Sequence, residues 1–293
     1  MQGIIINNIS NKYIVKTKVG IYNCNARGKL KKDDITPVVG DFVKIHAIDE
    51  DKKEGIIDEI LPRKNYIKRP KISNLSQILL VVSSKMPNPD LLMLDKQIAF
   101  AEFLGIKPII IVNKIDLDNK ELSEKIETLY TNIGYTVIST NAKTGEGINK
   151  IRNILKNQMS AFSGNSGVGK STILNCIFKK TVTEEGEVSK KSKRGKNTTT
   201  NITLYEIEDE TYVADTPGFS TFEIYEISSN ELAKYFIEFR EYMDKCRYVG
   251  CNHIKEEECG IKLAVQEGLI SKERYDRFVK IYYDIKDKEE HRW

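Results

Sequence analysis

The chain has 293 residues, which exceeds one average domain and leaves room for two domains and a small third. Its 46 basic and 42 acidic residues give a net charge of only +4, so composition neither requires nor excludes nucleic acid as a partner. The longest apolar runs have strand length, and residues 1–16 lack a basic stretch followed by a long apolar core, so we expect a cytoplasmic protein without a membrane span.

Residues 1–68 carry short runs in which apolar and polar residues alternate, separated by clusters of Gly, Asp and Lys. This pattern predicts a small all-β, OB-like barrel. The first 70 residues hold 14 basic and 9 acidic residues, and the resulting charge of +5 would attract RNA phosphates. The basic segment 62–71 has a proline near each end, which predicts an exposed linker.

From residue 75 onward, apolar runs of strand length alternate with amphipathic helical segments. Strands are expected at 78–82 and 109–112, and helices at 91–104 and 122–133. This alternation predicts a parallel sheet covered by helices, in an α/β domain spanning 69–222.

A candidate guanine-binding motif closes the predicted strand 109–112. Asn113, Lys114, Ile115 and Asp116 match N-K-x-D. The Asp116 carboxylate can accept hydrogen bonds from both N1–H and the N2 amino group of guanine, a donor pair that adenine lacks. The tetrapeptide alone is a weak signal, and an ordinary loop after a strand is the alternative.

A second base-supporting segment follows the predicted strand 136–138. Asn141, Ala142 and Lys143 stand where GTPases usually carry S-A-K, with Asn141 in place of the serine. A plain turn leading to Gly145 and Gly147 is the alternative.

A phosphate-binding loop is predicted between the strand 159–162 and the helix 172–178. The segment matches the P-loop pattern G-x-x-x-x-G-K-S/T with Gly164, Asn165, Ser166, Gly167, Val168, Gly169, Lys170 and Ser171, and Thr172 follows. Glycines let backbone N–H groups converge on phosphate at a helix N-terminus. Lys170 would hold the β- and γ-phosphates and Ser171 would ligate Mg²⁺. With the guanine motif, this loop favours GTP over ATP.

Asp215 and Gly218 fit the D-x-x-G element, in which the aspartate supports Mg²⁺ and the glycine N–H meets the γ-phosphate. A simple Pro-Gly turn is the alternative. The motif order is rotated, because the guanine motif precedes the P-loop while the cyclic order is intact. A circularly permuted GTPase domain keeps the same packed sheet and moves the chain ends to another loop.

The last segment, 223–293, is predicted to be mostly helical with one structural zinc ion. Cys246, Cys251, His253 and Cys259 supply four ligands within fourteen positions, as in tetrahedral Cys₃His sites. Reduced core cysteines beside a surface histidine are the alternative. A closed set of four protein ligands leaves no position for a catalytic water.

The motif order, the β-rich N-terminal segment and the Cys/His cluster resemble the circularly permuted, small-subunit-dependent GTPase A family, called RsgA, YjeQ or YloQ. Segments 37–41, 60–65, 195–200 and 264–275 carry the same resemblance. It implies an OB-fold barrel, a GTPase domain and a zinc domain that bind GTP/GDP with Mg²⁺. It also implies action late in maturation of the 30S subunit, through its 16S rRNA, with stimulation by that subunit. We expect a monomer.

The resemblance implies that Thr199 senses Mg²⁺ in the first switch, and Thr198 and Thr200 are the alternatives. Lys170, Thr199 and Gly218 are the predicted catalytic groups. Asn197 stands where the family often has histidine, and Phe219 where Ras-like enzymes carry a glutamine, so the water-positioning group stays open.

Two functions are weighed against each other. The first is an RNA-stimulated GTP hydrolase, in which the basic run at 190–196 meets rRNA, although a solvated loop is the alternative for that run. The second is a nucleotide-gated RNA-docking module in which turnover is incidental. The guanine motif and the closed metal ligand set disfavour an ATP-dependent kinase or a catalytic zinc enzyme.

Overall fold

The computed structural model describes residues 1–9, 12–28, 36–118, 121–184, 202–215 and 226–291. The chain forms two compact units. The first comprises residues 1–79, 142–163 and 170–219, and the second comprises 80–141, 164–169 and 220–293. Each therefore combines segments that are far apart in the sequence. The boundaries expected at 68/69 and 222/223 stay a prediction.

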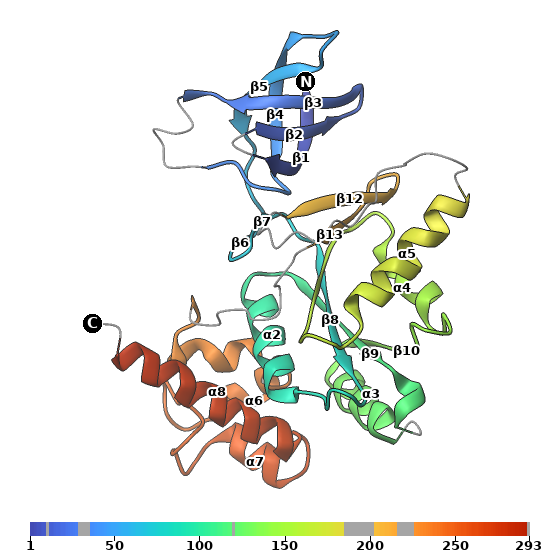
Figure 1. Ribbon diagram of the computed structural model, residues 1–293. Helices are drawn as coiled ribbons and strands as arrows, with labels where there is room; N and C mark the ends of the chain where they lie inside the picture. The colour runs from blue at the N-terminus through green and yellow to red at the C-terminus, as the bar shows by residue number, and fades with distance from the viewer. Residues whose placement is uncertain (10–11, 29–35, 119–120, 185–201, 216–225, 292–293) are drawn as a thin grey trace. The chain divides into compact units, whose positions relative to one another are not determined.

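Five strands of the first unit form a closed barrel (Figure 1). They are β1 (Gln2–Ile9), β2 (Lys12–Thr17), β3 (Gly20–Ala26), β4 (Phe42–Asp49) and β5 (Glu54–Ile60). β1 pairs antiparallel with both β2 and β4, β3 pairs parallel with β5, and β5 pairs with β4, which closes the ring. Ile5, Val15, Tyr22, Val43 and Ile57 are fully buried. The predicted OB-like barrel is confirmed.

The segment expected to be an open linker is fastened to the barrel. It contains β6 (Tyr66–Lys68), which forms a hairpin with β7 (Lys71–Ser73), and Ile67 of β6 is buried. Asp41 is fully buried and accepts hydrogen bonds from Arg63 Nε at 2.7 Å, Arg63 Nη2 at 2.8 Å and Ser73 Oγ at 2.6 Å. A buried carboxylate needs such partners. Nothing in the sequence indicated this buried contact, because charged residues such as Arg63 and Asp41 usually lie on the surface.

The rest of the first unit is α/β. It contains α4 (Ile148–Leu155), β11 (Met159–Ser163), α5 (Lys170–Glu184), β12 (Thr203–Glu208) and β13 (Thr211–Asp215). β11 pairs parallel with β13, which pairs antiparallel with β12. Every residue of β11 is buried, as expected of a central strand with both faces covered.

The second unit begins within β8 (Gln77–Ser83). It continues through α2 (Leu91–Phe103), β9 (Lys107–Asn113), the 3₁₀ turn η1 (Ile115–Leu117), α3 (Glu121–Ile133) and β10 (Thr136–Thr140). β9 lies between β8 and β10 and runs parallel to β10. The predicted alternation of strands and helices is confirmed. The three strands are two or three residues longer than their apolar runs, α3 begins one residue earlier than expected, and α2 ends one residue earlier.

The chain returns to the second unit as a helical segment. It contains η3 (Ser229–Tyr235), η4 (Ile237–Phe239), α6 (Arg240–Met243), α7 (Gly260–Gln266) and α8 (Lys272–Glu290). Phe236, Phe239 and Phe278 pack together, with ring centroids 5.0–5.2 Å apart. α8 lies beside α2 (Figure 1). Among the described residues, no helix has the length and apolar composition needed to cross a membrane.

A buried ion cluster joins α8 to α2, α3 and η4. Arg274 of α8 is fully buried and pairs with Asp95 of α2 and Glu238 of η4. Asp95 also accepts from Arg277 and from Tyr130 Oη at 2.6 Å. Burial and the nearby Asp95 raise the pKa of Tyr130 well above its usual value, so this hydroxyl stays a donor. Two carboxylates thus balance two guanidinium groups inside the unit.

Candidate functional site

The P-loop follows β11, and α5 begins at Lys170, which gives the expected sequence of strand, loop and helix. Gly164 is left-handed (φ 140°), and a Cβ there would lie 2.1 Å from the carbonyl oxygen of Val81. Only glycine allows the loop to pass so close to β8. The loop ends at a helix N-terminus, where backbone N–H groups and the helix dipole favour a phosphate.

Asn113, at the end of β9, connects the guanine motif to the P-loop. Its Nδ2 donates to the carbonyl of Val168 at 2.9 Å, and its Oδ1 accepts from Thr140 Oγ1 at 2.9 Å. A Cβ at Gly169 would lie 2.2 Å from Asn113 Nδ2, so the last glycine of the loop makes room for this amide. Asn113 is 2% exposed, and its side chain links the ends of β9 and β10 to the loop.

Lys114 makes the second connection. It has a left-handed backbone (φ 64°), and its Nζ donates to the carbonyl of Gly167 at 2.6 Å and to the carbonyl of Met86. Nothing in the sequence pointed to Met86, because a backbone carbonyl contributes no side-chain signal. The guanine motif and the P-loop are therefore held together by two side chains of one tetrapeptide.

The remaining base-binding candidates of this unit are Ile115, Asp116 and Asn141, which follow the carboxyl ends of β9 and β10. Ile115 is buried and begins η1, whereas the next residue, Asp116, is exposed. Asn141 is 6% exposed and follows the end of β10, whose Thr140 contacts Asn113. The carboxyl ends of β9 and β10 thus carry the polar groups, which is where α/β sheets bind ligands.

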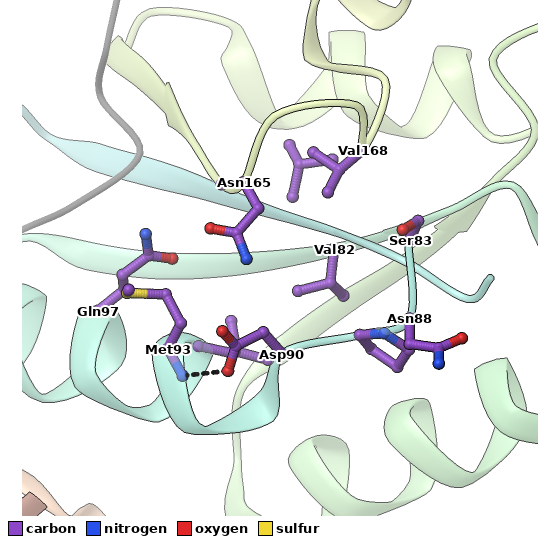
Figure 2. A pocket seen from close by; sticks show the side chains of 12 residues that line it. Val82, Ser83, Asn88, Asp90, Met93, Gln97, Asn165 and Val168 are labelled. Atoms are coloured by element: carbon purple, nitrogen blue, oxygen red, sulfur yellow. Dashed lines mark hydrogen bonds between the residues drawn. The ribbon is translucent and has the colours of Figure 1, made fainter. Parts of the chain in front are cut away.

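A small hollow lies beside the P-loop (Figure 2). Asn165 faces it from the loop, Asp90 from the N-cap of α2, and Met93 and Gln97 from the first half of that helix. Asp90 Oδ1 caps α2 by accepting from Met93 N at 2.9 Å. The Asn165 side chain is turned toward α2 (Figure 2). Ser166 and Gly167 are exposed, and Val168 is buried.

The first unit holds the other phosphate and magnesium candidates. Lys170, Ser171 and Thr172 form the first turn of α5, and Ser171 and Thr172 are exposed. Burial lowers the pKa of Lys170. A phosphate nearby would stabilise the charged ammonium and oppose this shift of the pKa.

Asp215 ends β13, the parallel neighbour of β11, with Ala214 opposite Ala161. It therefore lies at the same edge of the sheet as the exit of β11 toward the P-loop. Ala142 and Lys143 belong to this unit as well, and the carbonyl of Ala142 accepts from Cys176 Sγ of α5 at 3.2 Å.

Several predicted groups lie outside the described residues. They are Thr199 with its alternatives Thr198 and Thr200, Asn197, Gly218, Phe219 and the basic run at 190–196.

The four metal candidates converge in the helical segment. The ligand atoms of Cys246, Cys251, His253 and Cys259 all lie within 4.8 Å of one another. Cys246 Sγ and Cys259 Sγ are 3.8 Å apart, and each lies 3.4 Å from His253 Nδ1. In a tetrahedral site with Zn–S bonds of about 2.3 Å, two sulfurs stand roughly 3.8 Å apart. The cluster therefore has the dimensions of a zinc site.

The chemistry of the cluster fits the same ion. Burial lowers the pKa of His253, which favours the neutral imidazole that binds metals. Burial raises the pKa of the Cys251 and Cys259 thiols, and a divalent cation offsets that cost by binding thiolates. None of the five cysteines forms a disulfide. Four protein ligands complete a tetrahedron, which is the pattern of a structural site.

Comparison with known proteins covers the whole chain. Residues 2–57 match the model of the RsgA N-terminal domain, and residues 60–225 match the model of the RsgA GTPase. The small ribosomal subunit biogenesis GTPase RsgA of Caldanaerobacter subterraneus subsp. tengcongensis is 40% identical over 293 residues, which span 100% of this chain and 98% of that protein. The protein of the same name from Ruminiclostridium cellulolyticum is 43% identical over 287 residues, covering 97% of this chain and 94% of that one.

Two solved structures are similar over nearly their full length. YjeQ from Thermotoga maritima superposes with a TM-score of 0.85 at 35% identity, covering 97% of this chain and 98% of that one. YloQ, described as a circularly permuted GTPase, superposes with a TM-score of 0.82 at 33% identity, covering 98% and 95%.

Proposed function

The chain belongs to the RsgA GTPase family and is therefore a GTP-hydrolysing enzyme, and from this premise we propose that it acts in maturation of the small ribosomal subunit. Its membership confirms the resemblance drawn from the rotated motif order. The relatives named above are small ribosomal subunit biogenesis GTPases, and the proposal carries that role to this chain.

The observation that best supports a guanine nucleotide site is the double connection between the base motif and the phosphate loop. Asn113 bonds the carbonyl of Val168 and Lys114 bonds that of Gly167. One rigid support would then hold both ends of the nucleotide. Asp116, exposed at the start of η1, would read guanine through its two donors, and a base without them would leave the carboxylate unpaired.

The proposed phosphate chemistry follows from the first turn of α5. Lys170 would neutralise the β- and γ-phosphates, and Ser171, Thr199 and Asp215 would hold Mg²⁺, with Gly218 N–H meeting the γ-phosphate. The magnesium ion supplies electrostatic stabilisation of the charge that develops during transfer. Asn141, Ala142 and Lys143 would support the base, while the N–H groups from Gly164 to Thr172 would surround the phosphates.

The ribosomal part of the proposal has its own support. The barrel has the OB arrangement that binds nucleic acid in many proteins, and the first 70 residues carry a charge of +5. We propose that 16S rRNA is contacted there, and that the basic run at 190–196 senses the subunit. A cytoplasmic monomer, with one structural zinc ion held by the Cys₃His cluster, completes the proposal.

The decisive experiment is single-turnover GTP hydrolysis with and without purified small subunits. We expect slow hydrolysis alone and acceleration by several orders of magnitude on the subunit, because neither a histidine at 197 nor a glutamine at 219 is present to position water. Equal rates would favour the second function, a nucleotide-gated docking module.

A variant of the basic run tests how the subunit stimulates hydrolysis. Replacing Lys190, Lys191, Lys193, Arg194 and Lys196 with alanine should abolish stimulation and leave the intrinsic rate and GTP affinity nearly intact. If that variant is stimulated as strongly as the wild type, another surface of the protein mediates stimulation by the subunit.

A further inference from the structure

A carboxylate that is not a metal ligand lies inside the metal-binding loop. Glu256 Oε1 accepts from the backbone N–H of Asn252 at 2.8 Å, and Oε2 accepts from those of Ile254 at 2.9 Å and Lys255 at 3.0 Å. These donors flank His253 on both sides. Glu256 does not belong to the group of ligand atoms that converge on the metal position.

The backbone segment 252–255, whose N–H groups donate to Glu256, contains a residue in an unusual conformation. His253 is left-handed (φ 63°), a region that costs free energy for a residue with a Cβ. Its carbonyl accepts from Tyr275 Oη of α8 at 2.7 Å. The reversal of the chain at His253 places Nδ1 3.4 Å from both Cys246 Sγ and Cys259 Sγ. The ligand geometry therefore depends on a loop shape that the loop alone would not prefer.

We propose that Glu256 is a positioning residue for the metal site, which holds His253 in the left-handed conformation that directs Nδ1 at the zinc ion. The proposal rests on the zinc site proposed above. A metal-bound histidine is usually oriented by a hydrogen bond to its other ring nitrogen. Here the orientation is imposed through the backbone, from Glu256 on one side and Tyr275 on the other.

Charge argues for the same role. Three thiolates and one Zn²⁺ leave a net charge of −1, so a free carboxylate close by would weaken the site or compete for the metal. Three charge-assisted hydrogen bonds occupy both oxygens of Glu256 and direct them at the backbone. The carboxylate thus orders the loop while remaining outside the coordination shell.

The test uses full-length protein in three variants, with Glu256→Ala, Glu256→Gln and the control Glu257→Ala. Glu257 is exposed and carries the same charge one position further on. Zinc affinity is measured by competition with a chromogenic chelator. We expect Glu256→Ala to lower the affinity about 10- to 100-fold, the range found for outer-shell partners of metal ligands. Glu256→Gln, which keeps one acceptor, should lose less, and Glu257→Ala should stay within about two-fold of wild type.

Cobalt substitution separates positioning from general loss of structure. In Glu256→Ala loaded with Co²⁺, the thiolate charge-transfer bands should persist while the d–d bands change as the imidazole is lost or misaligned. Unchanged d–d bands together with wild-type zinc affinity would overturn the proposal. If Glu256→Ala does not fold, the same two measurements on Glu256→Gln decide. A wild-type chain that binds no zinc would instead refute the zinc site itself, an outcome visible before any variant is compared.

Discussion

The buried ion cluster around Arg274 offers the sharpest test of how the C-terminal helix is held. Arg274→Met keeps the volume and apolar stem of the side chain but removes the guanidinium. Glu238 then loses a partner for both of its oxygens, while Asp95 keeps Arg277 and Tyr130. Removing one member of a buried ion pair typically costs 3–5 kcal/mol, because the remaining charge stays desolvated. The contacts left to Asp95 favour the lower end, about 3 kcal/mol.

A matched control joins α8 to α3 instead of α2. Lys125 of α3 pairs with Glu273 of α8 at 2.9 Å, but these side chains are 61% and 57% exposed. Lys125→Met should cost less than about 1 kcal/mol, as exposed pairs do. Both variants keep the chain length and remove one positive charge, so they differ mainly in the burial of the pair.

Urea denaturation followed by far-UV circular dichroism gives the free energies of unfolding, and hydrogen exchange resolved by peptide gives their location. In Arg274→Met, exchange should accelerate in α2 and α8 and remain unchanged in the barrel strands. If Arg274→Met costs no more than Lys125→Met, or if exchange in α8 is unaffected, the cluster does not stabilise this unit and the reasoning from burial is wrong.

Three further predictions concern the nucleotide and the metal. Asp116→Asn should weaken GTP binding by at least 10-fold and improve xanthosine triphosphate binding, since xanthine has a carbonyl where guanine has an amino group, and unchanged GTP affinity in a titration would contradict the assignment. Lys170→Ala or Ser171→Ala should reduce phosphate release by at least 100-fold, because the first removes a phosphate-neutralising charge and the second a magnesium ligand, whereas wild-type turnover would place the site elsewhere. Freshly purified protein should contain one zinc ion per chain by elemental analysis, and removal of zinc by a chelator should unfold the segment from Cys246 to Cys259. A metal-free protein that keeps wild-type exchange rates from Cys246 to Cys259 would argue against a structural metal.

The sequence predicted those parts of the fold whose signal is local. The P-loop, the N-K-x-D motif and the Cys₃His spacing each occupy a few consecutive positions, and the structure places them on the elements expected. The alternation of apolar runs likewise located β8, β9 and β10, because buried parallel strands are apolar throughout.

Contacts between distant residues could not be predicted in this way. Asn113 and Val168 are 55 positions apart, and Arg274 and Asp95 are 179 apart. Neither pair leaves a periodic pattern, and buried charges such as Asp95 look like surface residues in a sequence. The prediction of an exposed linker at 62–71 holds for Lys64, Lys68 and Arg69, but it missed the contact of Arg63 with the buried Asp41, which depends on the closure of the barrel.

The ion cluster also bears on how this protein can be divided for experiments. The segment matched by the GTPase family model ends at residue 225, a natural point at which to cut the chain. A fragment ending there would keep Asp95 and Tyr130 but lose Arg274, Arg277 and Glu238, and Phe103 would lose the edge-to-face packing of Tyr235. Asp95 would then face solvent on an uncovered side of α2. Shortened proteins for crystallography or screening should therefore retain the chain through α8, and a fragment without it should be expected to aggregate for reasons unrelated to nucleotide binding.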